Sequence, residues 1–245
     1  MKAIYAVLMV VFAGIFCYSL TAVFSYHKDA GENKRETEEI MREVIQKTPQ
    51  RYEDKTAGQQ IDFEKLKHIN PDAVGWIVFN EPYVNGPLVQ TVDNSYYLEH
   101  SFRKKENMAG CLFMDCRNKS FDDRNVVIYG HNMLDRTMFG SLNDVFREQF
   151  WEESERDIIR ITDGQQHLRK YKIFSCYIAG EGEDYNATSF SDAADYTGFL
   201  KKITARSFRK TDVIVTADDH ILTLSTCAGA EGADKRRVVH AKMVG

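Results

Sequence analysis

Three residues close to predicted strands have the side chains that thiol chemistry needs. The run from His220 to Thr226 alternates and is rich in β-branched residues, so it predicts a strand that leads into Cys227. A second predicted strand, Val238–Val244, follows directly after Arg237. If the two strands pair as an antiparallel hairpin, the thiol and the guanidinium face each other at one rim of a sheet. The thiolate is the nucleophile in cysteine chemistry, and a nearby cation favours it.

A histidine completes this set of reactive groups. The apolar run Asn125–Tyr129 predicts a buried strand, and Gly130 and His131 follow at its end. A histidine on a glycine-led turn lies at the rim of a sheet and not in a core. At the rim it can act as a general acid or base. The sequence alone does not fix whether this rim is the one that carries the thiol.

Each of the three residues also has a simpler interpretation. Cys227 alone suggests a buried strand cysteine, His131 a turn residue, and Arg237 a surface ion-pair partner. The joint pattern and the chain order favour catalysis. A histidine before a strand-end cysteine disfavours papain-like enzymes, in which the cysteine comes first. The remaining histidines are interpreted as structural or exposed; they are His27, His68, His100, His167, His220 and His240.

The elements that must position these residues are mainly strands. Strand-like runs are predicted at Gly75–Asn80, Pro87–Val92, Gly110–Asp115, Asn125–Tyr129, Asp157–Thr162, Lys172–Ala179, Val213–Thr216, His220–Thr226 and Val238–Val244. Helical patches are predicted at Phe63–His68, Asn143–Phe150 and Ala193–Ile203. Many short strands in series indicate a β-barrel or sandwich with peripheral helices.

The N-terminus predicts a membrane anchor. Residues Ala3–Phe24 are almost unbroken apolar, and their length as a helix would be roughly 33 Å, enough for a bilayer core. The alternative is a cleaved signal peptide, but no clear small-x-small cleavage site follows. Apolar residues at helical spacing then predict a helix from about Asn33 to Lys47, either a stalk or a brace on the domain. We therefore divide the chain into an anchor (1–26), a polar linker with a helix (27–62) and a catalytic domain (63–245).

Composition narrows the partners and cofactors. The net charge of −4 argues against nucleic acid, and no glycine-rich phosphate loop is visible. We predict that three further cysteines are buried small hydrophobic residues and do not form a disulfide framework; they are Cys111, Cys116 and Cys176. Because no close-spaced Cys and His ligand pairs occur, we expect no metal site and no cofactor.

The chain resembles class B sortases, the membrane-anchored cysteine transpeptidases of Gram-positive bacteria. The resemblance covers roughly Phe63 to Val244. It is carried by Tyr129–Met133 (YGHNM), Thr223–Cys227 (TLSTC), Arg237–Val239 (RVV), Asn70–Ile77, Asp93–Leu98 and Met133–Leu142. It implies an eight-stranded sortase-type β-barrel, an N-terminal transmembrane helix and an extracellular catalytic domain.

The resemblance also implies a mechanism and partners. Cys227 would attack the carbonyl of a threonine in the sorting signal of a surface protein, forming a thioacyl-enzyme. His131 would exchange protons with the leaving and incoming amines, and Arg237 would stabilise the oxyanion. The acceptor would be an amine of a cell-wall peptidoglycan precursor. The substrate-binding residues would be Asn94, Leu98, Tyr185, Thr188, Ser225 and Thr226.

Other functions remain open. Ala228 stands where some class B members carry an acidic residue, so the sequence of the sorting signal is not fixed. A pilus-polymerising sortase is disfavoured because no Asp-Pro-aromatic lid motif is visible. The non-enzyme alternative is a catalytically silent surface-binding domain, and the intact His131, Cys227 and Arg237 argue against it.

Overall fold

The predicted strands form a barrel with helices around it. The computed structural model describes residues 2–45, 60–153, 155–180, 182–226 and 235–245. Its elements, in chain order, are α1 (Lys2–Val44), α2 (Phe63–Ile69), β1 (Ala73–Phe79), β2 (Val84–Val89), η1 (Tyr96–Leu98), β3 (Phe113–Met114), β4 (Asn125–Gly130), η2 (Phe139–Phe146), α3 (Glu148–Glu152), β5 (Ile158–Asp163), β6 (Leu168–Ala179), α4 (Ala193–Ala205), β7 (Ile221–Thr226) and β8 (Arg236–Met243).

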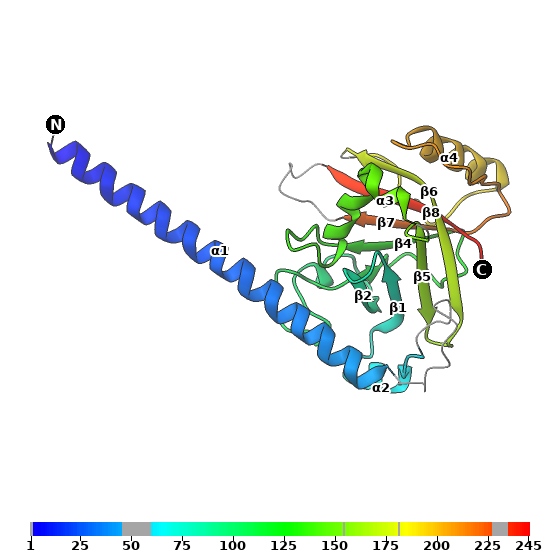
Figure 1. The fold of residues 1–245 in the computed structure, drawn as a ribbon, viewed down its shortest axis with the longest axis horizontal. Coiled ribbons are helices and arrows are strands. Elements are labelled where there is room, and N and C mark those ends of the chain that lie inside the picture. Colours follow the sequence, from blue (N-terminus) through cyan, green and yellow to red (C-terminus); the bar gives the residue numbers. More distant parts are fainter. Residues whose placement is uncertain (1, 46–59, 154, 181, 227–234) are drawn as a thin grey trace.

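The eight strands close into a barrel in the order β1-β2-β3-β4-β7-β8-β6-β5 (Figure 1). This confirms the predicted eight-stranded barrel with peripheral helices. The predicted strand Val213–Thr216 is wrong, although Val213 and Val215 do pack against the core beneath α4. Every barrel strand already has two neighbours, so no edge is left for this segment to pair with.

The barrel interior explains why the central strands are so apolar. Inward-facing side chains of all eight strands form one buried cluster, including Val126 and Ile128 of β4 and Leu222 and Leu224 of β7. Full burial of such a side chain stabilises the fold by about 1.5–3 kcal/mol. β4 and β7 are parallel neighbours in the barrel, so the residues that follow them emerge at the same rim.

The N-terminal helix α1 is one continuous helix across the predicted anchor and brace. Its second half packs on the barrel, where Ile40 and Val44 are fully buried against α2, β1 and β2. The brace interpretation is therefore confirmed over the part of the helix that the structure describes; Lys47, its predicted end, lies outside the described residues. The apolar first half projects away from the barrel (Figure 1). By length and composition it is apolar enough to cross a membrane, and it is not covered by the rest of the protein.

The other helical predictions hold to different degrees. α2 begins after Asp62, whose side chain accepts a hydrogen bond from the Lys65 backbone N–H at 3.1 Å. α4 begins in the same way, with Asp192 accepting from the Asp195 N–H at 2.8 Å. Such N-caps satisfy backbone donors that the first turn leaves unpaired. The patch predicted at Asn143–Phe150 is instead divided between the 3-10 helix η2 and the short helix α3.

Candidate functional site

The strand register brings the ends of β4, β7 and β8 together. In the parallel pair β4–β7, Gly130 lies opposite Thr226. In the antiparallel pair β7–β8, Ser225 lies opposite Val238, which confirms the predicted hairpin pairing. His131 follows Gly130, so it lies beside the end of β7. Cys227 follows Thr226 in the chain but lies outside the described residues.

Arg237 is bound to the end of β7 through its backbone. Its N–H donates to the Thr226 hydroxyl oxygen at 2.9 Å. Its guanidinium carbon lies 6.0 Å from the centroid of the Phe146 ring, at the edge of the range for a cation–π contact. Arg237 as a whole is half-buried, with its backbone at the end of β7 and its guanidinium near Phe146.

His131 has one ring nitrogen committed to the protein. Its Nε2 lies 2.7 Å from the carbonyl oxygen of Leu98. A carbonyl can only accept, so Nε2 carries a hydrogen and donates it. The nitrogen that remains for proton exchange is Nδ1.

The turn that carries His131 is tightly closed. The Phe139 N–H donates to the His131 carbonyl at 2.9 Å. Met138 has φ +49° and ψ −129°, a strained conformation for a residue with a Cβ. A Cβ on Gly140 would come within 2.0 Å of the Met133 carbonyl oxygen, so only glycine fits there. These contacts within the turn fix the position of the His131 backbone, from which the imidazole side chain extends.

The helix α1 also contacts this turn. The Leu134 N–H donates to the Tyr26 hydroxyl oxygen at 2.8 Å. That hydroxyl lies 3.9 Å from the Met133 sulfur, and Met133 is buried together with Ala30 of α1. The turn is therefore held from outside by a residue just past the apolar run, a contact that the sequence did not reveal.

The predicted substrate-binding residues fall into two groups. Asn94 and Leu98 lie on the His131 side: the Leu98 carbonyl binds His131, and the Asn94 side-chain oxygen accepts from the Cys116 N–H at 2.8 Å. Tyr185 and Ser225 form the other group, with their hydroxyls 3.0 Å apart. Ser225 and Thr226 are buried. Thr188 is half-buried and lies three residues beyond Tyr185.

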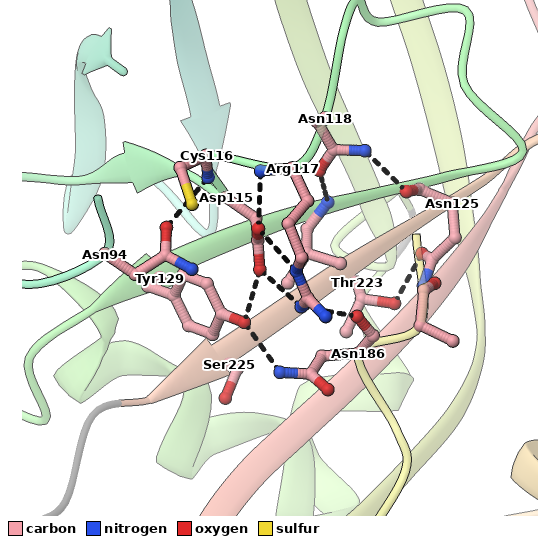
Figure 2. Close-up of polar contacts among 12 residues, drawn as sticks. Asn94, Asp115, Cys116, Arg117, Asn118, Asn125, Tyr129, Asn186, Thr223 and Ser225 are labelled. Carbon is pink, nitrogen blue, oxygen red and sulfur yellow. Dashed lines mark hydrogen bonds and ion pairs between the residues drawn. The ribbon is translucent and has the colours of Figure 1, made fainter. Parts of the chain in front are cut away.

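A polar network that sequence reasoning missed connects the two groups (Figure 2). The fully buried carboxylate of Asp115 receives a bidentate pair of hydrogen bonds from Arg117, at 2.9 and 2.7 Å, and one from the Tyr129 hydroxyl at 2.9 Å. Asn186 donates to the Tyr129 hydroxyl at 2.8 Å, and its carbonyl accepts from Arg117 at 2.9 Å. The segment that carries Tyr185 is thereby fastened to β4, two residues before His131.

The electrostatics of the network follow from burial and pairing. Burial alone would raise the pKa of Asp115, but its hydrogen bonds from Arg117 and Tyr129 outweigh this and hold the pKa below its ordinary value. Burial, and then the charge of Asp115, raise the pKa of Tyr129, so its hydroxyl stays protonated and donates. Asp115 and Arg117 lie in the turn after β3, so strand alternation in the sequence could not have placed their side chains together.

The remaining thiols that the structure describes are not in a reactive setting. Cys111 and Cys176 are buried, as predicted, and burial raises the pKa of both, to about 11 for Cys176. Cys116 is only half-buried, so its prediction as a buried hydrophobe is wrong; the strand predicted at Gly110–Asp115 extends only over Phe113–Met114 and leaves Cys116 in the following turn. Over the described part of the chain, no group of three His, Cys, Asp or Glu side chains could hold a metal ion.

Comparison with known proteins agrees with this geometry. The sortase domain family matches residues 88–244. Sortase B of Staphylococcus aureus is 34% identical over 234 residues, which cover 95% of this chain and 92% of that protein. A crystal structure of sortase B from Bacillus anthracis superposes with a TM-score of 0.76 at 36% identity, covering 89% of this chain and 99% of that one. A substrate complex of the Staphylococcus aureus enzyme superposes with a TM-score of 0.69 at 36% identity, covering 75% of this chain and 84% of that one.

Proposed function

The chain belongs to the sortase family, in class B, and is a cysteine transpeptidase; from this premise we propose that Cys227, His131 and Arg237 are its catalytic residues. A sorting-signal substrate and a cell-wall amine acceptor follow from the family. The observation that carries the assignment is the register at the end of β7, where Gly130 and Arg237 both adjoin Thr226. Cys227 directly follows Thr226 in the chain, and consecutive Cα atoms are about 3.8 Å apart, so the thiol belongs to the residue next to Thr226.

The first half of the reaction cleaves the sorting signal. The Cys227 thiolate attacks the carbonyl carbon of the substrate threonine, and the resulting oxyanion is stabilised by the Arg237 guanidinium. The C–N bond then breaks, and His131 gives a proton to the leaving amine. The product of this half is a thioester between Cys227 and the surface protein.

The second half transfers the surface protein to the cell wall. The amine of a peptidoglycan precursor attacks the thioester carbonyl, His131 takes up the proton that the amine loses, and the thiolate leaves. Because Nε2 of His131 donates to the Leu98 carbonyl, both proton transfers would use Nδ1. The Leu98 contact thus supports a fixed ring orientation throughout the cycle.

The sorting signal would lie across the rim between the two groups of predicted substrate-binding residues. Asn94 and Leu98 would line one side and Tyr185 and Thr188 the other, with the network of Asp115, Arg117 and Tyr129 between them. Ser225 and Thr226 are buried, so their contribution would be to shape the floor of the site beside Cys227.

The location of the reaction follows from α1. Residues 1–26 would form a retained single-pass anchor, residues 27–62 the linker and brace, and residues 63–245 the catalytic domain outside the cell. The apolar, uncovered first half of α1 supports a membrane anchor. A cell-wall acceptor supports the extracellular orientation, because peptidoglycan lies outside the membrane.

The test is replacement of the thiols one at a time. Cys227→Ala should abolish both peptide cleavage and transpeptidation by the full-length chain in detergent micelles. Cys116→Ala is the matched control, because Cys116 is the one partly exposed thiol among the described residues of the catalytic domain, and it should keep both activities. Turnover by Cys227→Ala close to that of the unmodified chain would rule out the cysteine mechanism, and a silent surface-binding domain predicts no turnover in any variant.

A further inference from the structure

A cationic pocket adjoins the proposed site, and neither Asn94 nor Tyr185 is among the residues that line it. It has a volume of about 310 Å³ and lies between the His131 turn, η2 and the start of β8. Its polar lining consists of Asn132, Arg136, Asn143, Asp144, Arg147 and Arg237. We call this the arginine pocket. Arg237 forms part of its wall, and Asn132 directly follows His131, so an occupant would lie beside the proposed catalytic groups.

The charges in the arginine pocket do not balance. Arg136 and Arg147 both pair with the buried carboxylate of Asp144, Arg147 at 3.6 Å. That carboxylate also accepts a hydrogen bond from Asn80 at 2.9 Å. Among the described residues, the guanidinium groups of Arg136 and Arg147 therefore share one carboxylate, which leaves an excess of positive charge. Arg136 is 38% exposed and Arg147 64% exposed, so both can reach a ligand from solvent.

The arginine pocket also holds an unused hydrogen-bond acceptor. The Asn143 amide nitrogen donates to the Asn132 side-chain oxygen at 2.9 Å. The Asn143 side-chain oxygen is buried and has no hydrogen-bond partner among the residues that the structure describes. A buried acceptor without a partner costs free energy unless a ligand donates to it. The lining therefore suits a ligand that carries both an anionic group and an N–H, which a peptide carboxylate does and an isolated phosphate does not.

The position of the arginine pocket distinguishes it from the sorting-signal groove. η2 contacts both β7 and β8 and carries Asn143 and Asp144. None of the predicted substrate-binding residues is among those that line the arginine pocket, and Leu98 binds His131 through Nε2. In the second half of the reaction the acceptor amine enters where the leaving amine has departed, while the acyl part of the sorting signal still occupies its groove.

We propose that the arginine pocket binds a carboxylate on the peptide that supplies the acceptor amine. This inference rests on the proposed function, because it names a feature of that reaction's second substrate. Guanidinium groups bind carboxylates bidentately, and such charge-assisted hydrogen bonds are about twice as strong as neutral ones. The carboxylate would hold the acceptor while its amine reaches the thioester beside Arg237.

The experiment compares two acceptors that differ in one charge. The full-length chain in detergent micelles is given a peptide that it cleaves, together with triglycine or triglycinamide, and the acceptor KM of each is measured. We expect the KM of triglycine to be roughly tenfold lower, as a single charge-assisted contact would give. Hydrolysis without acceptor tests the proposed function separately, since its failure would remove turnover with every acceptor.

Variants assign the preference to the arginine pocket. In Arg147→Gln and in Arg136→Gln the KM ratio of the two acceptors should fall towards one. The same peptides are used throughout, so differences in amine basicity cancel. Arg42→Gln is the matched control: Arg42 is 78% exposed, pairs only with Glu38 at 3.9 Å among the described residues, and lies on α1 away from the pocket, so its ratio should remain that of the unmodified chain.

Three outcomes would overturn the proposal. The first is no preference for triglycine in the unmodified chain. The second is a preference that survives both Arg147→Gln and Arg136→Gln. The third is inhibition of transfer by millimolar inorganic phosphate without any preference for triglycine, which would assign the arginine pocket to a phosphate instead.

Discussion

Neighbouring arginines on β8 have different surroundings. Arg237 donates its backbone N–H to Thr226, lies over Phe146 and lines the arginine pocket. Arg236 lies opposite Ala179 of β6 in the strand register. Since successive side chains of a strand point to opposite faces, only one of the two can face the end of β7.

We expect Arg237→Ala to lower kcat/KM for peptide cleavage by about 10²–10³, the cost of losing an oxyanion donor. Arg237→Lys should restore little, because an ammonium cannot reproduce the planar guanidinium fork. Arg236→Ala should be nearly silent. The measurement is kcat/KM of the three variants on one cleaved peptide. Impairment of Arg236→Ala instead of Arg237→Ala would mean that the side chains alternate in the opposite sense.

The residues of the site were predictable to different extents. The pattern of His131, Cys227 and Arg237 is visible in sequence because each residue adjoins an apolar, β-branched run. The network of Asp115, Tyr129 and Asn186 is not, because its members come from three separate segments and meet only once the barrel has closed. The burial of Ser225 and Thr226 is likewise a property of the folded sheet.

Among the elements, α1 contacts both the barrel core and the turn that carries His131. Its buried face contributes Ile40 and Val44 to the core, while Tyr26 binds the turn that carries His131. A chain that begins at residue 27 therefore loses a contact with the turn that carries His131, which a chain beginning at residue 25 retains.

Tyr26→Ala should lower kcat/KM about two- to tenfold, because a hydrogen bond contributes about 0.5–1.5 kcal/mol net. Hydrogen exchange of the Leu134 amide should accelerate at the same time, which reports on the turn itself. Tyr26→Phe removes only the hydroxyl, so it distinguishes the contribution of the hydrogen bond from that of ring packing. Tyr18→Ala is the matched control, since Tyr18 lies on the same helix and is 77% exposed. Equal activity and exchange in Tyr26→Ala and Tyr18→Ala would show that the contact has no functional role.

The predicted elements failed where pairing depends on distant residues. Val213–Thr216 has the alternation of a strand and packs accordingly, but the closed barrel offers it no partner. The run Gly110–Asp115 pairs only over Phe113–Met114. By contrast, α2 and α4 were predicted closely, because their N-caps and apolar spacing are local properties of the chain.

At the scale of the whole molecule, a buried histidine links the fold to pH. His240 of β8 is fully buried between Thr223 and Tyr177, whose hydroxyls lie 2.9 and 3.1 Å from its two ring nitrogens. Burial, and to a lesser extent the charge of Arg206, lower the pKa of His240 to about 3. The folded protein therefore keeps this ring neutral at pH values where an unfolded chain would protonate it.

The free energy of unfolding should accordingly fall on acidification. The unfolded histidine titrates near pH 6.5, so the His240 contribution is complete above that value and decreases by about 1.4 kcal/mol per pH unit down to about pH 3. His240→Gln cannot titrate, so its stability should decrease less steeply between pH 6.5 and 4.5. Denaturant unfolding of both chains in detergent micelles at several pH values measures the two slopes. Identical slopes would contradict a buried neutral histidine.

The unbroken course of α1 couples the orientation of the catalytic domain to the lipid. The helix has 43 residues without a described interruption, a length of about 65 Å, and its last part is packed into the barrel core. Once the apolar segment lies in a bilayer, a change in hydrophobic thickness that alters helix tilt must rotate the barrel through the same angle. The bilayer would then set the angle at which the site faces its cell-wall acceptor, because the described part of α1 contains no hinge that could absorb the difference.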